Sequence, residues 1–295
     1  MWRGWLAVFC AAVLASVVAA ADYADYLYIP PESESKTAEP VPAAALTALL
    51  KAPRPVHVVD EFAGMNAALK AGATHPALQV AVHTPVDVPG VTLFAEAQPG
   101  LGGRVYVADV MSADAHAVRF EVDLRGLAPD SAVYAVDLTG PRAFGPFTAA
   151  DGVRWLPTLG GDTGALLVTA KGTARPGLRV VTVAHFYVDP AAKALPCPAP
   201  VACESDPMFQ EVSTGVGRLL VPVRNVGAFL CTGTLLNNAD TAAREPLMLS
   251  AHHCFDGDVI VSGIEVYWDH RVANCDGTGV RELANMPRSR GAALL

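Results

Sequence analysis

Alternating apolar and polar residues in the middle of the chain predict β-strands. In residues 118–124 every even position is apolar, whereas Arg119, Glu121 and Asp123 occupy the odd positions between them. Because side chains alternate between the two faces of a strand, one face is apolar and the other is charged. Further strands are predicted over residues 80–91, 133–138, 164–169 and 178–188. Gly and Pro residues separate them, and this spacing predicts an antiparallel, β-sandwich-like region over residues 76–190.

The residues before position 76 lack this alternation. Residues 22–75 are rich in Pro and Ala and predict a linker with two short helices, over residues 43–51 and 65–71. Residues 1–21 start with a basic n-region, continue with an apolar run and end in three alanines, a pattern typical of a cleaved signal peptide. An uncleaved anchor is the alternative, but the apolar run is shorter than the roughly 20 residues that a membrane-spanning helix needs.

Composition narrows the class of protein. A signal peptide directs the chain out of the cytoplasm, so it is predicted to be secreted or periplasmic, without membrane contact after cleavage. The net charge of −8 and the absence of Lys and Arg clusters exclude nucleic acid as a partner. Charged residues make up only 17% of the chain, beside 25 Gly and 23 Pro, which favours an all-β fold rich in turns.

Two apolar stretches in the C-terminal third carry the candidate chemistry. Residues 227–236 contain Cys231, and residues 246–254 end in His253 and Cys254. The two cysteines are 23 positions apart, a spacing that suits a disulfide contributing about 3 kcal/mol by the chain-entropy relation. Such a bridge holds His253 at a strand end, where an imidazole can act as a general base.

Residues 229–236 and 250–254 resemble the trypsin-like serine proteases, and within them the bacterial lysyl endopeptidases. The stretch 266–269 and Cys275 fit the same branch, and the resemblance extends over residues 194–285. It implies that residues 191–295 form the first, partial β-barrel of a protease domain and that His253 is the base of the catalytic triad. Protein or peptide substrates and no metal or cofactor are implied as well.

The resemblance also implies how the remaining cysteines are used. It pairs Cys203 with Cys275, in addition to the bridge between Cys231 and Cys254. Cys10 leaves with the signal peptide, so Cys197 is expected to remain as an unpaired thiol. In the family its partner lies further along the chain.

The chain departs from the family pattern after His253. The triad of this fold runs His, Asp, Ser in chain order, but only 42 residues follow His253 and none of their serines lies in a Gly-Asp-Ser-Gly context. Asp269 follows His253 by 16 positions, too soon for the triad of this family, and is interpreted as a solvated strand end. The chain is therefore expected to be a C-terminally truncated precursor that lacks the Asp and Ser and is inactive.

Prolines crowd residues 190–200 and predict the boundary between the two regions. Lys193 lies in this stretch and is a candidate processing site, since a lysine-specific relative can cleave after it. Residues 145–148, 155–157 and 160–162 weakly resemble the pro-region that precedes such proteases. The alternative is a non-catalytic exported β-sandwich that serves as a folding aid, an inhibitor or a binding module.

Three other motifs have weaker functional interpretations. Asp162-Thr163-Gly164 matches an aspartic protease signature, but the sequence has no second copy to complete the carboxylate pair. Zinc binding by the set His252, His253, Cys254 and His270 is disfavoured, since adjacent residues of a strand face opposite ways. His185 and Tyr187 share one strand face and are interpreted as structural.

Overall fold

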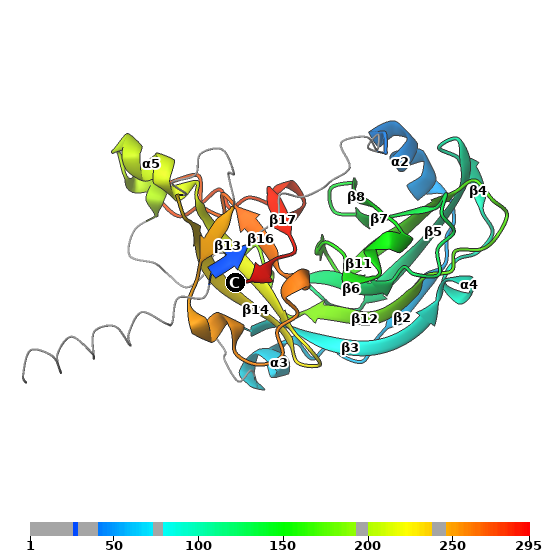
Figure 1. Cartoon of the computed structure of the whole chain (residues 1–295), viewed down its shortest axis with the longest axis horizontal. Coiled ribbons are helices and arrows are strands. Elements are labelled where there is room, and N and C mark those ends of the chain that lie inside the picture. The colour runs from blue at the N-terminus through cyan, green and yellow to red at the C-terminus, as the bar shows by residue number, and fades with distance from the viewer. Residues whose placement is uncertain (1–25, 29–40, 73–78, 193–199, 238–245) are drawn as a thin grey trace, which may run out of the picture.

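The computed structural model describes residues 26–28, 41–72, 79–192, 200–237 and 246–295. It is mostly β, with two sheets and a few short helices (Figure 1). No helix in these ranges is long and apolar enough to cross a membrane. The predicted signal peptide, Lys193 and Cys197 lie outside the described residues.

One sheet has six strands, and one of its pairings, between β2 and β5, is parallel. Its order is β2 (Val56–Val59), β5 (Gly103–Ser112), β11 (Thr163–Ala170), β7 (Ala132–Asp137) and β8 (Arg142–Phe147), and β4 (Gln98–Gly100) also pairs with β5. Helix α2 (Ala43–Lys51) packs on one face of this sheet through Leu46 and Leu49. The helix predicted over residues 43–51 is therefore confirmed with the same bounds.

The other sheet has twelve strands and is antiparallel. Its main path is β10 (Leu159–Gly160), β6 (Ala117–Asp123), β12 (Arg179–Phe186), β3 (Gln79–Pro89), β14 (Gly227–Leu235), β13 (Val216–Val223), β16 (Glu265–Trp268) and β17 (Arg288–Arg290). Four strands lie off this path: β9 (Val153–Trp155), β1 (Tyr26–Tyr28), β15 (Leu247–Leu249) and β18 (Ala293–Leu294). The backbone of β1 pairs with both β15 and β18.

The remaining elements are short. Helix α3 (Asn66–Gly72) lies one residue beyond the predicted helix over residues 65–71. The others are α4 (Gly90–Leu93), α5 (Pro207–Ser213) and the 3-10 turns η1 (Ala149–Asp151), η2 (Val201–Cys203), η3 (His252–Phe255), η4 (Val261–Gly263) and η5 (Leu283–Asn285). Helix α5 has a capped start, because the Asp206 side chain accepts a hydrogen bond from the Met208 amide and Pro207 occupies the first turn.

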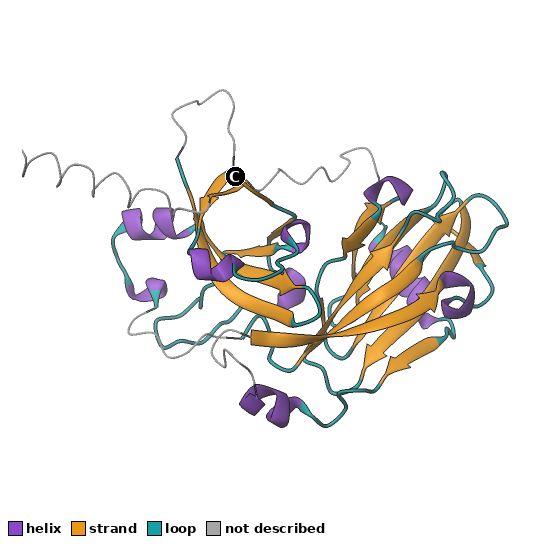
Figure 2. Ribbon diagram, turned by 60° about the horizontal axis from the view of Figure 1, so that its bottom comes forward, coloured by secondary structure: helices purple, strands orange, loops and turns teal. Residues whose placement is uncertain are grey.

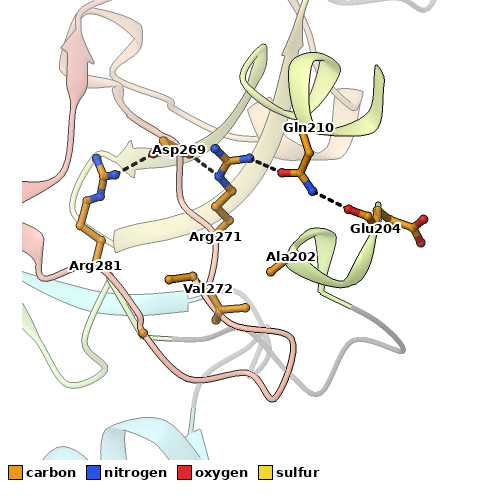
Figure 3. Close-up of a pocket in the computed structure, with 9 residues that line it drawn as sticks. Ala202, Glu204, Gln210, Asp269, Arg271, Val272 and Arg281 are labelled. Carbon is orange, nitrogen blue, oxygen red and sulfur yellow. Dashed lines mark hydrogen bonds and ion pairs between the residues drawn. The ribbon is translucent and has the colours of Figure 1, made fainter. Parts of the chain in front are cut away.

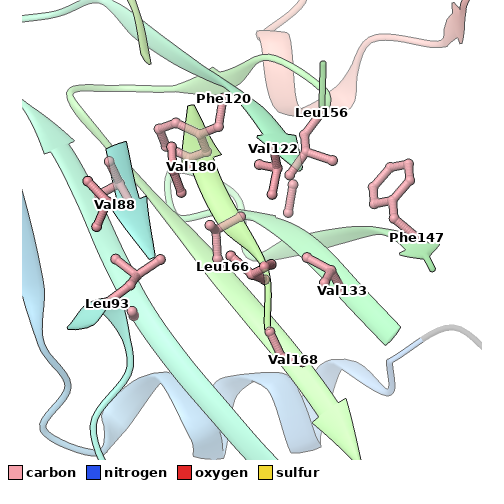
Figure 4. Close-up of a cluster of buried hydrophobic side chains, with 14 of the residues drawn as sticks. Val88, Leu93, Phe120, Val122, Val133, Phe147, Leu156, Leu166, Val168 and Val180 are labelled. Atoms are coloured by element: carbon pink, nitrogen blue, oxygen red, sulfur yellow. The ribbon is translucent and has the colours of Figure 1, made fainter. Parts of the chain in front are cut away.

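The main core lies between the two sheets, as the sandwich-like pattern predicts. Phe120 and Val122 of β6 face Leu166 and Val168 of β11, together with Val133 of β7 (Figure 4). The predicted strand over residues 118–124 thus corresponds to β6, with its apolar face buried. Its other face is not simply solvated, because Arg119 is only 2% exposed.

The twelve-stranded sheet continues from the N-terminal region into the C-terminal one. Strand β3 pairs with β12 along one edge and with β14 along the other, where Gly227 lies opposite Val82 and Ala228 opposite Ala81. Beyond β14, the strands β13, β16 and β17 curl into half a barrel (Figures 1 and 2). The division of the chain at residue 190 stays a prediction, and the structure adds that both parts share one sheet.

Candidate functional site

The strands around His253 form a hairpin with a third strand on its edge. Strand β13 pairs along its full length with β14, and β14 pairs with β15 through Thr234 and Leu235. The apolar stretch 246–254 is shorter as a strand than its pattern suggests, since β15 ends at Leu249 and η3 begins at His252. This turn lets Cys254 reach back to β14.

Both predicted disulfides are present. Cys231 of β14 is bonded to Cys254 of η3 with a Cα–Cα distance of 6.1 Å, and Cys203 is bonded to Cys275 with a Cα–Cα distance of 4.7 Å. Cys231 and Cys254 pack against a cluster that includes Leu219, Met248 and Phe255. The segment that carries His253 is therefore fixed to the half-barrel by a covalent bond and by apolar packing.

The imidazole of His253 is exposed beside the Cys231–Cys254 bridge. Its ligand nitrogen and the sulfur atoms of Cys231 and Cys254 lie within 4.8 Å of one another. Among the described residues, none forms a hydrogen bond or an ion pair with this ring. The neighbouring His252 is exposed as well, with Nε2 3.4 Å from Oδ1 of Asp256.

The carboxylates that follow His253 have partners within the described part of the chain. Asp269 pairs with Nε of Arg271 at 2.5 Å and with Nη2 of Arg281 at 2.7 Å. These groups line a pocket of about 500 Å³ with Gln210 and Glu204 (Figure 3). Asp269 directly follows β16 and belongs to a network of ion pairs, so its half-buried carboxylate is not simply solvated as its position suggested.

Two serine hydroxyl groups of the C-terminal region also form hydrogen bonds. Ser289 accepts a hydrogen bond from Nε1 of Trp268 at 2.8 Å, and Ser250 donates to the carbonyl of Thr232 at 2.7 Å. Asp258 forms an exposed pair with Arg224. None of these contacts involves His253.

Comparison with known proteins connects this half-barrel to one family of peptidases. A family model described as "Lysyl endopeptidase, C-terminal domain" matches residues 192–295. The lysyl endopeptidase of Pseudomonas aeruginosa (strain PAO1) is 24% identical over 263 residues, which cover 73% of this chain and 56% of that protein. The chain is distantly related to lysyl endopeptidase. It spans about half the length of this curated relative.

The relationship to lysyl endopeptidase agrees with the cysteine chemistry. Two disulfides in one chain are typical of proteins that fold outside the reducing cytosol. They are consistent with an extracytoplasmic location, as the N-terminal pattern also predicts. Whether Cys197 is unpaired and whether the chain is processed after Lys193 stay predictions.

A metal ligand set is present only in part. The zinc set weighed from the sequence is not assembled, because Nε2 of His270 donates to the Ala191 carbonyl at 3.1 Å. In the described residues one group of His, Cys and acidic side chains has metal-site geometry, namely Cys231, His253 and Cys254. Its two sulfurs are joined in a disulfide, which removes the thiolates that Zn²⁺ prefers.

The other motifs have structural partners. Nδ1 of the buried His185 lies 2.9 Å from Oγ of Ser112, and its Nε2 lies 2.7 Å from Oδ1 of Asn66. Tyr187 donates to the Gln79 carbonyl at 3.0 Å, and burial raises the pKa of its hydroxyl to about 12. Asp162 accepts a hydrogen bond from Thr163 in the turn that precedes β11.

The sequence pattern missed a buried ionic cluster between the two regions. Glu265 of β16 is 0% exposed, and its Oε1 accepts from Nη1 of Arg288 at 3.0 Å. Its Oε2 accepts from the amide and hydroxyl of Thr158 at 3.1 and 2.6 Å and lies 4.0 Å from Nε of Arg119. Arg119 and Thr158 belong to the N-terminal region, so this cluster joins the two parts of the chain. In the sequence, a charged residue on an alternating strand looks the same whether it faces solvent or is buried in an ionic cluster.

The charges in this cluster compensate one another. Burial by itself would raise the pKa of Glu265, but Arg288 and Arg119 outweigh it and, with the hydrogen bond from Thr158, hold that pKa below its usual value. The carboxylate is therefore ionised inside the protein. Its role is to match the buried guanidinium groups across the joint.

Proposed function

We propose that the C-terminal region carries the general-base histidine of a trypsin-like serine endopeptidase, and that this histidine is His253. The observation that carries the proposal is an exposed imidazole placed next to the Cys231–Cys254 bridge at the end of a β-hairpin. The match of residues 192–295 to a lysyl endopeptidase domain supports it.

The proposed reaction is acyl transfer on protein or peptide substrates. A serine hydroxyl attacks the peptide carbonyl, while the imidazole of His253 removes the hydroxyl proton and later returns it to the leaving amine. The exposed position of the ring suits this role, since the base must reach both groups. A preference for cleavage after lysine is proposed because the relative from Pseudomonas aeruginosa is a lysyl endopeptidase.

We further propose that these 295 residues correspond to a secreted precursor and do not hydrolyse peptides by themselves. Loss of a triad member lowers turnover by roughly 10⁴- to 10⁶-fold. Asp269 pairs with Arg271 and Arg281, and Ser289 accepts a hydrogen bond from Trp268, so these contacts do not involve this histidine. A signal peptide over residues 1–21, a pro-region up to residue 190 and processing after Lys193 complete the proposal.

The first test is to read the gene beyond the codon for Leu295. An in-frame Asp and a Gly-Asp-Ser-Gly motif are expected if the chain is a piece of an ordinary serine protease. The 295-residue chain is then assayed with a lysyl ester and a serine-directed active-site probe, where neither turnover nor labelling is expected. Labelling of the 295-residue chain would contradict its inactivity.

The second test addresses His253 itself in the longest open reading frame. His253→Ala should lower kcat/KM on a lysyl ester by at least about 10⁴-fold, whereas His252→Ala should change it by less than about tenfold. The neighbouring imidazole is a matched control because it is exposed in the same turn. Equal activity of the two variants would remove His253 from the mechanism.

A second candidate function, favoured by the shared sheet, is that the N-terminal region serves as a folding aid for the half-barrel. Strand β3 covers one edge of β14, and Arg119 faces the buried Glu265. The expected result is that residues 200–295 produced without the N-terminal region are recovered in soluble, oxidised form only when that region is supplied as a separate chain. Full recovery without it would exclude this function.

A further inference from the structure

We propose that the outer side of helix α5, the α5 surface, is a docking site for a basic, amphipathic peptide segment of a partner protein. Its apolar part consists of Met208, Phe209 and Val212, and the exposed acidic residues next to it in the chain are Glu204, Asp206 and Glu211. The α5 surface does not include His253, so its proposed role does not depend on the peptidase function.

The large apolar side chains of α5 face solvent. Met208, Phe209 and Val212 are 59%, 51% and 61% exposed. Val212 follows Met208 by four positions and Phe209 by three, so the three side chains lie together on one side of the helix. A surface helix normally turns its apolar side toward the core, as α2 does with Leu46 and Leu49, which are 1% and 8% exposed. Helix α5 has the reverse arrangement.

The side of α5 that faces the protein is polar. The Gln210 side chain accepts a hydrogen bond from Nη1 of Arg271 at 3.2 Å (Figure 3), and the Ser213 hydroxyl accepts one from the same nitrogen at 3.0 Å. Nε2 of Gln210 donates to the carbonyls of Val201 and Glu204 at 2.8 and 3.0 Å. The helix is therefore held by hydrogen bonds, while its three large apolar side chains belong to none of the apolar clusters of the described residues.

Two further features fix α5 in place before any partner binds. The Asp206 side chain caps the first turn by accepting from the Met208 amide, and Pro207 presets its backbone. The bridge between Cys203 and Cys275 ties the turn η2 before the helix to the loop after β16. Figure 1 shows α5 at the periphery of the molecule, where a partner can reach it. A partner therefore meets a surface that is already ordered, which lowers the entropy cost of binding.

The charge around α5 indicates the chemistry of the partner. Residues 200–217 contain the three acidic residues Glu204, Asp206 and Glu211, all exposed, and no Lys or Arg. Exposed apolar patches with a polar rim mark interaction sites, and the partner that complements an acidic rim is basic. A segment with apolar side chains on one side and Lys or Arg beside them fits both parts of this surface. An anionic membrane and a second copy of the chain are disfavoured, because both would bring negative charge against these carboxylates.

The experiment measures binding of a fluorescein-labelled amphipathic helical peptide of Leu and Lys to the full chain by fluorescence anisotropy. Matched peptides carry Glu in place of Lys, or Ser in place of Leu, and each should bind at least about tenfold more weakly. Added salt should weaken binding of the Leu-Lys peptide, because it screens the charges. Equal binding of the Lys and Glu peptides would overturn the proposal. The mass of the peptide is checked after the titration, so that its hydrolysis, which bears on the peptidase proposal alone, is distinguished from loss of binding.

Substitution of an apolar residue then assigns the binding to α5. Phe209→Ser should weaken binding of the Leu-Lys peptide at least about fivefold, because it removes the aromatic side chain of the α5 surface. Val226→Ser is the matched control and should leave the affinity within about twofold. Val226 is 45% exposed, in the turn between β13 and β14 at the other end of β13 from α5. Equal affinity of the two variants would overturn the proposal.

A pair of charge variants tests the acidic part of the surface. The double variant Glu204→Gln/Glu211→Gln should weaken binding at least about threefold at low salt. The control Glu96→Gln/Asp130→Asn changes the net charge equally at exposed positions of the N-terminal region and should leave the affinity within about twofold. An equal loss in both double variants would show that net charge alone attracts the peptide and would overturn the proposal. A dimer of the chain that Phe209→Ser dissociates, without peptide binding, would assign the α5 surface to a second copy and would also overturn it.

Discussion

At the scale of single residues, the buried charge of Glu265 is the feature with the largest consequence. Its carboxylate faces Arg288 at 3.0 Å and Arg119 at 4.0 Å, and all three side chains are at most 4% exposed. A buried ion pair adds little net stability compared with an apolar replacement, but removal of one partner leaves an uncompensated charge. The cluster is therefore sensitive to single substitutions.

The first prediction concerns this carboxylate. Glu265→Gln keeps the shape of the side chain but leaves two guanidinium groups buried without an anion, so the free energy of unfolding should fall by about 3 to 5 kcal/mol. The exposed Glu96→Gln should change it by less than about 0.5 kcal/mol. Urea denaturation of both variants measures the difference, and equal midpoints would contradict the role assigned to Glu265.

His83 makes the stability of the protein dependent on pH. It is 8% exposed, and its ring lies 4.7 Å from the ring of Trp155. Burial, helped by the nearby Arg119, lowers its pKa from 6.5 to about 3. The unfolded chain therefore binds a proton at this residue below about pH 6.5, while the folded chain stays neutral there until about pH 3.

The second prediction follows because the pKa of His83 is lower in the folded chain than in the unfolded chain. The stability that His83 contributes is present above pH 6.5 and is lost as the pH falls toward 3, at no more than about 1.4 kcal/mol per pH unit. His83→Gln should flatten the fall in unfolding free energy between pH 6.5 and 4 relative to the wild type. A slope unaltered by the His83 change would refute the assignment.

At the scale of elements, the joint between β3 and β14 depends on a glycine. Gly227 has φ of +155°, and a Cβ built there would lie 1.9 Å from the carbonyl oxygen of Ala81. A side chain at position 227 would therefore force β3 and β14 apart. The close contact lets one sheet pass from the N-terminal region into the half-barrel.

The third prediction tests this contact. Gly227→Ala should reduce the free energy of unfolding by about 2 to 5 kcal/mol, because overpacking and an unfavourable φ act together. Gly172→Ala is the matched control, since no atom lies within 4 Å of the added methyl group, and its effect should be below about 1 kcal/mol. Thermal unfolding of both variants gives the comparison, and a neutral Gly227→Ala would show that the joint tolerates separation.

A strand with one apolar face is easier to predict from the sequence than a strand that is buried on both faces. Strand β6 has one apolar face, so its alternation is visible, and residues 118–124 were assigned nearly to its bounds. Strand β5 was missed, because Val105 and Val107 pack toward α2 while Tyr106 and Ala108 pack into the core between the sheets. A strand buried on both faces has no alternation to detect.

At the scale of the whole molecule, the two regions are joined by more than the shared sheet. Arg218 donates to the carbonyls of Pro190 and Ala192 at 2.9 and 2.8 Å, and His270 donates to that of Ala191. The end of the N-terminal region is therefore held on the half-barrel immediately before Lys193. These hydrogen bonds of Arg218 and His270 do not require an intact peptide bond after Lys193.

The fourth prediction is that the two regions stay associated after cleavage at Lys193. Strand pairing of β3 with β14, the Glu265 cluster and the Arg218 contacts should keep both fragments in one peak on size-exclusion chromatography at neutral pH. Glu265→Gln should release a measurable fraction of the cut protein, whereas Glu96→Gln should not. Separation of the wild-type fragments at micromolar concentration would contradict this view of the interface.

The sequence by itself determined the local features of this protein. Alternation located one-sided strands such as β6, and the spacing of Cys231 and Cys254 predicted a bridge beside His253. Only the tertiary structure showed that β3 pairs with β14, that Arg119 meets Glu265 and that Asp269 pairs with two arginines. These contacts join residues far apart in the chain, and the burial that decides whether a charge is solvated or paired depends on how the sheet curls.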